Sequence, residues 1–152
     1  VVGLVIDEIG HTKILQKVVD NPLPYVPGEF YKRELPCLLA LINDLPGHQL
    51  EYIIIDGYVY VDNDELYGLG GHLYQALDAK VPIIGVAKTF YKGNEQTTKE
   101  VVRGQSKNPL FVSSIGIDIN KAAQIIQTME GPNRIPDLIK KVDTLTKQLQ
   151  DY

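Results

Sequence analysis

Two charged side chains follow apolar stretches of this 152-residue sequence, and both side-chain types suit metal or phosphate chemistry. Asp56 comes near the end of Glu51–Gly57 (EYIIIDG), and Lys88 ends Val81–Lys88 (VPIIGVAK). A carboxylate at the end of a buried strand is costly unless it is paired, hydrogen-bonded or bound to a metal. Carboxylate oxygens are the ligands that Mg²⁺ prefers, so Asp56 is the best single candidate for a metal ligand. Its ordinary alternative is a turn residue at a strand exit.

Other residues qualify more weakly for the same site. Glu34 lies at the start of a predicted helix, where a carboxylate equally serves as a cap or complements the helix dipole. The acidic run 62–65 is a third candidate, with a solvated loop as its alternative. Gly57 allows a sharp turn and keeps the space in front of Asp56 open. His72 falls on a glycine-rich predicted helix, where it either faces the site or packs within the fold.

The stretch Pro24–Pro36 (PYVPGEFYKRELP) presents Tyr25 between two prolines. Each proline fixes its own φ and biases the residue before it toward extended conformations, so this loop is stiff. A stiff loop suits an aromatic ring that must meet a ligand. The alternative is an aromatic residue at the edge of the core beside ordinary turn prolines.

The elements that would position these residues form an α/β domain over residues 1–152. The stretches ending near Asp56 and Lys88 predict buried strands of a mixed sheet. Ligands collect beyond the carboxyl ends of parallel strands, so we expect both residues at one edge. The other predicted elements are a hairpin of Val1–Ile6 and Thr12–Val19, a helix over Leu38–Leu45 with Pro36 in its first turn, helices over Tyr67–Leu77, Ile119–Met129 and Ile135–Leu149, and short strands within Thr97–Gly104 and Pro109–Gly116.

The composition fits an ordinary globular chain, with 44% hydrophobic and 22% charged residues. Cys37 is the single cysteine, which excludes an internal disulfide and indicates a reducing, cytoplasmic setting. No apolar run approaches the roughly 20 residues of a membrane span, so we expect no membrane association. The net charge of −4 gives no indication that the protein as a whole binds nucleic acid. The basic residues of the segment Lys88–Lys107, together with Lys32 and Arg33, suit contacts with phosphates. For the segment Lys88–Lys107, the alternative is a solvated hairpin.

Three ordered blocks of the sequence resemble the endonuclease V family. YVPGEFYKRE is similar to the family's YVPG loop, which ends in Phe-Arg-Glu. IIIDG followed by GLGGHL is similar to its Asp-Gly block and its Gly-Leu-Ala-Ser-His-Leu segment, and VPIIGVAK is similar to its strand ending in Gly-Val-Ala-Lys. The resemblance covers nearly the whole chain and implies an RNase H-like fold, with a central mixed sheet flanked by helices. Because the sequence opens directly on a strand-like run, we expect the family's first strand upstream of residue 1.

The resemblance also implies roles for individual residues. Tyr25 matches an aromatic wedge beside a flipped base, in a loop that Pro27 and Gly28 shape. Lys88 matches a lysine near the scissile phosphate. The implied catalytic residues are Glu34, Asp56 and Lys88, with Glu34 and Asp56 as metal ligands, and the implied substrate-binding residues are Tyr25, Pro27, Gly28, Gly57 and His72.

The function implied by the resemblance is a Mg²⁺- or Mn²⁺-dependent endonuclease of DNA repair. It would act, as a monomer, near inosine or other deaminated or distorted sites in DNA or RNA. The sequence departs from the family in YVYVDNDELYG, where family members have histidines and an arginine, and in Ser113–Gly116, which lacks the family's histidine. A degenerate nucleic-acid-binding protein of the same fold therefore stays open as an alternative. So does an unrelated α/β enzyme with a small-molecule substrate.

Overall fold

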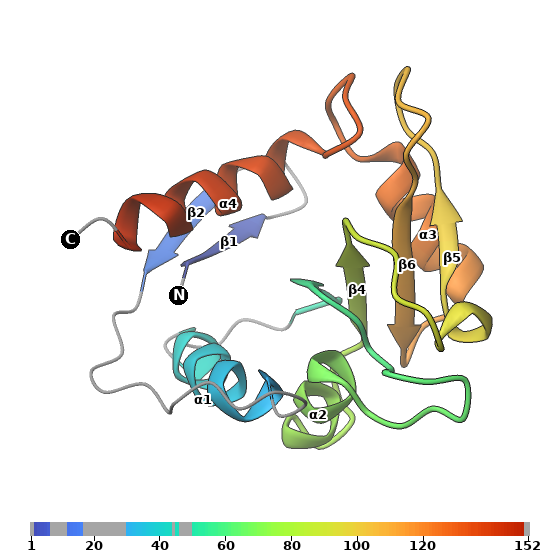
Figure 1. Ribbon diagram of the computed structural model, residues 1–152. Coiled ribbons are helices and arrows are strands. Elements are labelled where there is room, and N and C mark those ends of the chain that lie inside the picture. The colour runs from blue at the N-terminus through green and yellow to red at the C-terminus, as the bar shows by residue number, and fades with distance from the viewer. Residues whose placement is uncertain (1, 7–11, 17–29, 44, 46–49, 151–152) are drawn as a thin grey trace. The chain divides into compact units, whose positions relative to one another are not determined.

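The computed structural model describes residues 2–6, 12–16, 30–43, 45 and 50–150 of the chain (Figure 1). The chain divides into two compact units. One unit comprises residues 1–48 and 137–152, and the other comprises residues 49–136.

The first unit contains the predicted hairpin. β1 (Val2–Ile6) pairs antiparallel with β2 (Thr12–Gln16), in a register that sets Val2 opposite Gln16. α4 (Asp137–Gln150) packs against β1, as Figure 1 shows. The β-branched pattern therefore predicted this pairing correctly.

α1 (Phe30–Asn43) belongs to the same unit and begins earlier than expected. Pro36 lies in the middle of α1, so the prediction that it occupies the first turn was wrong. Pro36 has no N–H to donate to the carbonyl four residues before it, so α1 continues through this position without that backbone hydrogen bond. Cys37 and Leu41, one turn apart, are buried, and Cys37 behaves as a small core residue.

The second unit is built on a mixed four-stranded sheet, in the order β3-β4-β6-β5. β3 and β4 are parallel, and the other two pairs are antiparallel. This arrangement confirms the predicted α/β class with a central mixed sheet and flanking helices (Figure 1). The elements of this unit are β3 (Ile53–Asp56), α2 (Leu69–Ala76), β4 (Ile83–Ala87), the short 3₁₀ helix η1 (Glu95–Thr97), β5 (Lys99–Val101), β6 (Leu110–Ile115) and α3 (Ile119–Thr128).

The core of this unit lies along β4, whose five residues are all buried. Continuous burial is typical of a central strand covered on both faces, as the apolar run predicted. α3 packs against β5 and β6 and buries Ala122, Ala123 and Ile126. Its N-terminus is capped by Asp118, whose carboxylate accepts hydrogen bonds from the backbone N–H groups of residues 120 and 121.

α2 packs against β4 and approaches the chain after β3 closely. A Cβ atom at Gly70 would lie 2.9 Å from the Val59 side chain and 3.2 Å from that of Ile55. The glycines of this helix therefore mark close packing, as the sequence indicated. None of the helices in the described ranges combines the length and apolar character that a membrane span requires.

Candidate active site

The carboxyl ends of β3 and β4 bring Asp56 and Lys88 to one edge of the sheet. The parallel register sets Asp56 opposite Val86, and the Gly57 N–H donates to the Val86 carbonyl at 3.0 Å. Lys88 follows Val86 by two residues, directly after the end of β4. Asp56 is exposed and Lys88 is half-buried. The strand ends therefore lie together as the sequence predicted.

Gly57 leaves open space at the end of β3. Its φ of +136° is a conformation that residues with a Cβ atom rarely adopt. Among the described residues other than its two chain neighbours, none has an atom within 4 Å of the position that a Cβ would take. A ligand can therefore approach the end of β3 without displacing a side chain at this position.

The chain after Gly57 crosses over β4 and is held there by Ser113. The Ser113 hydroxyl accepts a hydrogen bond from the buried Val59 N–H at 2.9 Å. Gly85 permits the crossing, because a Cβ atom there would lie 2.6 Å from the Gly57 carbonyl oxygen and 2.7 Å from Ser113 Oγ. The position of Asp56 thus depends on residues from two neighbouring strands.

The loop at 60–67 contains the acidic run and folds onto itself. Asp62 Oδ1 accepts hydrogen bonds from the backbone N–H groups of Asp64 and Leu66, both at 2.9 Å. The loop is also tied to η1, since the buried Asn94 side chain donates to the Tyr60 carbonyl at 3.0 Å. Asp62 therefore has a structural role, which favours the loop interpretation of the acidic run over metal binding.

Three aromatic residues beside Lys88 were not identified from the sequence. The Tyr58 and Tyr91 rings lie 6.0 Å apart, and Phe90 packs edge-on against Phe111 with ring centres 5.8 Å apart. Phe90 is 56% exposed and Tyr91 is 50% exposed. Phe90 and Tyr91 follow Lys88 by two and three residues in the sequence, and this proximity was the signal that could have found them. We call Tyr58, Phe90 and Tyr91 the aromatic surface.

The Tyr58 hydroxyl joins the two strand exits. It donates a hydrogen bond of 2.6 Å to the Thr89 carbonyl. Burial raises the pKa of Tyr58 above its ordinary value, and a hydrogen bond with the Tyr91 backbone offsets this only in part. The hydroxyl therefore stays protonated at neutral pH and keeps its role as a donor.

His72 lies on α2, half-buried, with its ring edge-on to that of Tyr67 at 5.8 Å. Burial lowers the pKa of His72 below its ordinary value, and a hydrogen bond with the Tyr67 backbone offsets part of this effect. The imidazole is therefore neutral at physiological pH. A role of His72 in substrate binding stays a prediction.

The other predicted site residues belong to the first unit. Glu34 is half-buried on α1, beside the exposed Lys32 and Arg33. Tyr25, Pro27 and Gly28 lie outside the described residues, so their predicted roles stay predictions.

The basic segment that follows β4 is less accessible than its sequence suggested. Arg103 is 3% exposed and donates hydrogen bonds to backbone carbonyls, so the expectation that it contacts phosphate was wrong. Lys99 is exposed and donates to the Asn120 side chain at 2.6 Å. Lys92 and Lys107 are exposed. The bases that remain suited to phosphate contact are therefore lysines.

The donor set at the sheet edge fits a hard divalent cation only in part. Asp56 offers exposed carboxylate oxygens beside open space, which suits Mg²⁺ or Mn²⁺. Within the ranges that the structure describes, no group of three or more His, Cys, Asp and Glu side chains is arranged to hold a metal. Mg²⁺ commonly keeps several waters in its coordination shell, so a single carboxylate does not exclude it here.

Comparisons with known proteins agree with this architecture. The sequence model of the endonuclease V family matches residues 2–144. The endonuclease V of Ignicoccus hospitalis is 30% identical over 143 residues, which cover 84% of this chain and 64% of that relative. The chain therefore spans slightly less than two thirds of the relative's length.

Solved structures share the fold. The endonuclease V of Bacillus subtilis superposes with a TM-score of 0.72 at 21% identity, over 97% of this chain and 71% of that one. The Ciona intestinalis enzyme, solved in complex with a 24mer DNA containing an inosine followed by a ribo-adenosine, superposes with a TM-score of 0.67 at 20% identity, over 93% and 72%. Given the match of the family's sequence model over residues 2–144, the chain belongs to the endonuclease V family.

Proposed function

We propose that this protein is a metal-dependent endonuclease that cleaves nucleic acid near inosine or other deaminated or distorted sites. The observation that carries the proposal is the pairing of the β3 and β4 ends, which sets Asp56 beside Lys88 with open space at Gly57. Family membership supports it, as does the inosine-containing DNA bound by the Ciona relative. Membership of this family also sets aside the alternative of an unrelated α/β enzyme.

The residues at the edge have complementary tasks in such a reaction. Asp56 and Glu34 would hold Mg²⁺ or Mn²⁺. When bound, such an ion polarises a phosphate oxygen and lowers the pKa of a coordinated water. The Lys88 ammonium would offset the negative charge that develops on the phosphate oxygens. Tyr25, in the loop shaped by Pro27 and Gly28, would fill the gap left by a base that leaves the stack.

The aromatic surface supports contact with nucleic acid near the same edge. Exposed aromatic rings bind bases by stacking, and nearby lysines neutralise phosphates. Phe90 and Tyr91 lie between Lys88 and Lys92 in the sequence, so both kinds of contact are available over a few residues. An unpaired stretch beside the modified base is the part of a substrate that suits this surface.

Asp56→Asn tests whether the edge is catalytic. The substitution keeps the size of the side chain and removes the charge that a cation needs, so nicking of an inosine-containing duplex in Mg²⁺ should fall by about a thousandfold or more. Binding of the same duplex, measured in Ca²⁺, should change by less than about threefold.

Asp118→Asn is the matched control. It makes the same chemical change in the same unit but keeps the side-chain oxygen that caps α3, so both nicking and binding should persist. The degenerate binding protein is favoured over the endonuclease if the wild-type chain binds the duplex in Ca²⁺ but never nicks it in Mg²⁺, and if Asp56→Asn changes neither binding nor nicking.

A further inference from the structure

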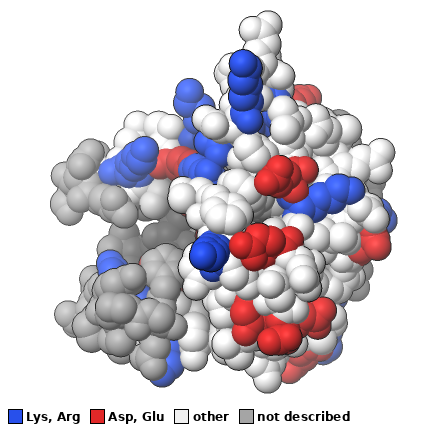
Figure 2. Space-filling model, turned by 45° about the vertical axis from the view of Figure 1, so that its right-hand side comes forward, with Lys and Arg blue, Asp and Glu red and all other residues white. Residues whose placement is uncertain are grey.

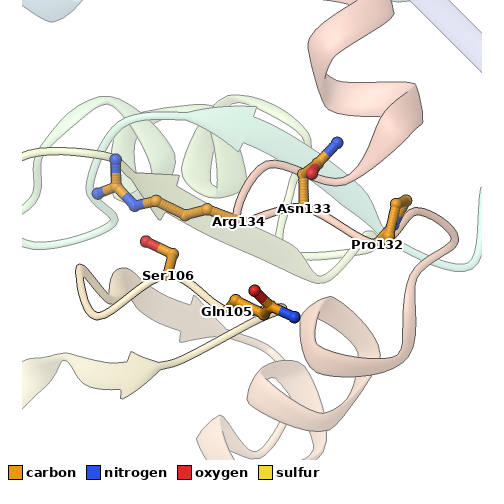
Figure 3. A pocket seen from close by; sticks show the side chains of 5 residues that line it. All are labelled: Gln105, Ser106, Pro132, Asn133 and Arg134. Atoms are coloured by element: carbon orange, nitrogen blue, oxygen red, sulfur yellow. The ribbon is translucent and has the colours of Figure 1, made fainter.

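Arg134 links the end of β4 to the loop before β6. Its guanidinium group donates hydrogen bonds to the carbonyls of Lys88, Asn108 and Pro109, the last two at 3.0 and 2.9 Å. Figure 3 shows the Arg134 side chain extended along one side of a pocket of about 340 Å³, with Ser106 beside it. The pocket lies between two loops and is lined by Gln105, Ser106, Pro132, Asn133 and Arg134.

The bond from Arg134 begins where the strand ladder stops. The antiparallel pairing of β4 and β6 ends at Ala87 opposite Phe111, so the Lys88 carbonyl lies just beyond the paired residues. A guanidinium group presents several donors in one rigid plane and can hold carbonyls from two segments at once. Arg134 therefore continues, through a side chain, the link between β4 and the segment that enters β6.

The loop that carries Arg134 is itself fixed by a second arginine. The buried Arg103 donates hydrogen bonds to the carbonyls of Met129, Gly131 and Arg134, the last two at 3.1 and 3.4 Å. These three acceptors span the connection between α3 and α4. The loop that carries Arg134 is thus held by hydrogen bonds from Arg103, just after β5. These bonds fix the backbone from which the Arg134 side chain extends.

We propose that Arg134 is a positioning residue for Lys88 in the reaction. The inference rests on the proposed function, in which the Lys88 ammonium stabilises charge on the phosphate. Holding the carbonyl of residue 88 restricts the backbone on which the lysine stands, and so restricts where its ammonium group can lie. Without the guanidinium group, the residue after the ladder would sample several backbone conformations, and the ammonium group would meet the phosphate less often.

Limited trypsin digestion tests the contact independently of nuclease activity. Trypsin cleaves the Lys88–Thr89 bond at the very carbonyl that Arg134 holds. In Arg134→Gln, cleavage after Lys88 should become about tenfold faster because this segment opens more often. Cleavage after the exposed Lys92, read from the same digest by mass spectrometry, should stay unchanged.

A double-mutant cycle on nicking of the inosine-containing duplex tests the role in the reaction. Arg134→Gln should lower kcat about tenfold with KM unchanged while Lys88 is present, and should have no further effect in a Lys88→Ala background. Arg134→Lys keeps the charge but not the planar donor group, so its kcat should lie between the values of wild type and Arg134→Gln. It replaces Arg134→Gln in the cycle if that variant does not fold.

The matched control is Gln127→Ala. It removes another hydrogen bond from a side chain to a backbone carbonyl in this unit, from Gln127 to Val102 at 2.8 Å. This variant should change neither the rate of tryptic cleavage after Lys88 nor the kcat for nicking.

Two results would overturn the positioning role: unchanged cleavage after Lys88 in Arg134→Gln, or equal effects of Arg134→Gln with and without Lys88. A wild-type chain that never nicks, in combination with faster tryptic cleavage in the variant, would retain the contact but overturn the proposed function and the positioning role with it.

Discussion

At the scale of single residues, Asp56 and Lys88 differ in what surrounds them. Asp56 is exposed beside a glycine with open space, whereas Lys88 is half-buried with its carbonyl held by Arg134. An exposed carboxylate has oxygens that a divalent cation can reach. The hydrogen bond from Arg134 holds the backbone at Lys88. The edge thus combines an exposed carboxylate with a lysine whose backbone is held.

Tyr25 provides a test of base recognition that is separate from cleavage. In Tyr25→Ala, the preference for an inosine-containing duplex over an unmodified one should fall about tenfold, because stacking on an aromatic ring contributes about 1–3 kcal/mol per base. Competition binding in Ca²⁺ measures this preference. Tyr25→Phe keeps the ring and should retain it. Equal discrimination by wild type and Tyr25→Ala would mean that the prolines around Tyr25 only shape a turn.

The sequence indicated Asp56 and Lys88 because their chemistry is local: a charged residue stands at the end of an apolar run. Arg134 and Ser113 gave no such signal. Each acts on residues dozens of positions away, and only the folded sheet shows that they meet. Arg103 was misassigned for the same reason, since a basic residue that donates to buried carbonyls has the same sequence signature as one that contacts phosphate.

At the scale of elements, the crossing of the chain over β4 depends on one side chain of β6. Ser113→Ala would leave the buried Val59 N–H without its acceptor, which should lower the free energy of unfolding by about 1–3 kcal/mol. Urea denaturation measures this change.

Ser114→Ala provides the comparison within the same strand. Ser114 is half-buried and donates to the Ile117 carbonyl at 2.8 Å, so its loss should cost about 0.5–1.5 kcal/mol. If Ser113→Ala were no more destabilising than Ser114→Ala, the Ser113 hydroxyl would not hold the crossing.

Most of the elements themselves followed from local patterns. The hairpin, β4 and α3 matched their predictions because period and continuous apolarity are properties of a few neighbouring residues. The start of α1 was missed because Pro36 usually marks a first turn, whereas here the helix continues past an exposed proline. The self-bonded loop at Asp62 was ambiguous, since acidic runs serve equally as loops and as ligands.

At the scale of the whole molecule, binding of nucleic acid must overcome a net charge of −4. Figure 2 shows the largest group of carboxylates at the lower right of the visible face, with other carboxylates and the lysines and arginines dispersed over it. Attraction to phosphates must therefore come from a local set of bases. Three lysines after β4 form such a set: Lys88, Lys92 and Lys107. Lys99 in the same segment is exposed as well but donates to Asn120.

Salt dependence measures how many of these lysines contact phosphate. If all three do, log K for a short duplex should fall with log salt at a slope of about −3. Lys107→Ala should reduce the slope by about one, whereas Lys121→Ala, an exposed lysine on α3, should leave it unchanged. A slope that is the same in wild type and Lys107→Ala would remove that lysine from the interface.

The outer strand β5 has a consequence for how copies of this chain meet at high concentration. A long, flat, apolar strand at the border of a sheet recruits strands from other molecules and seeds aggregation. β5 has only three residues, and Lys99 and Glu100 are exposed. The bond from Lys99 to Asn120 anchors the lysine to α3 beside this border. This side of the sheet is therefore blunted against edge-to-edge association, and replacing the two charged residues by valine would convert it into a template for aggregates.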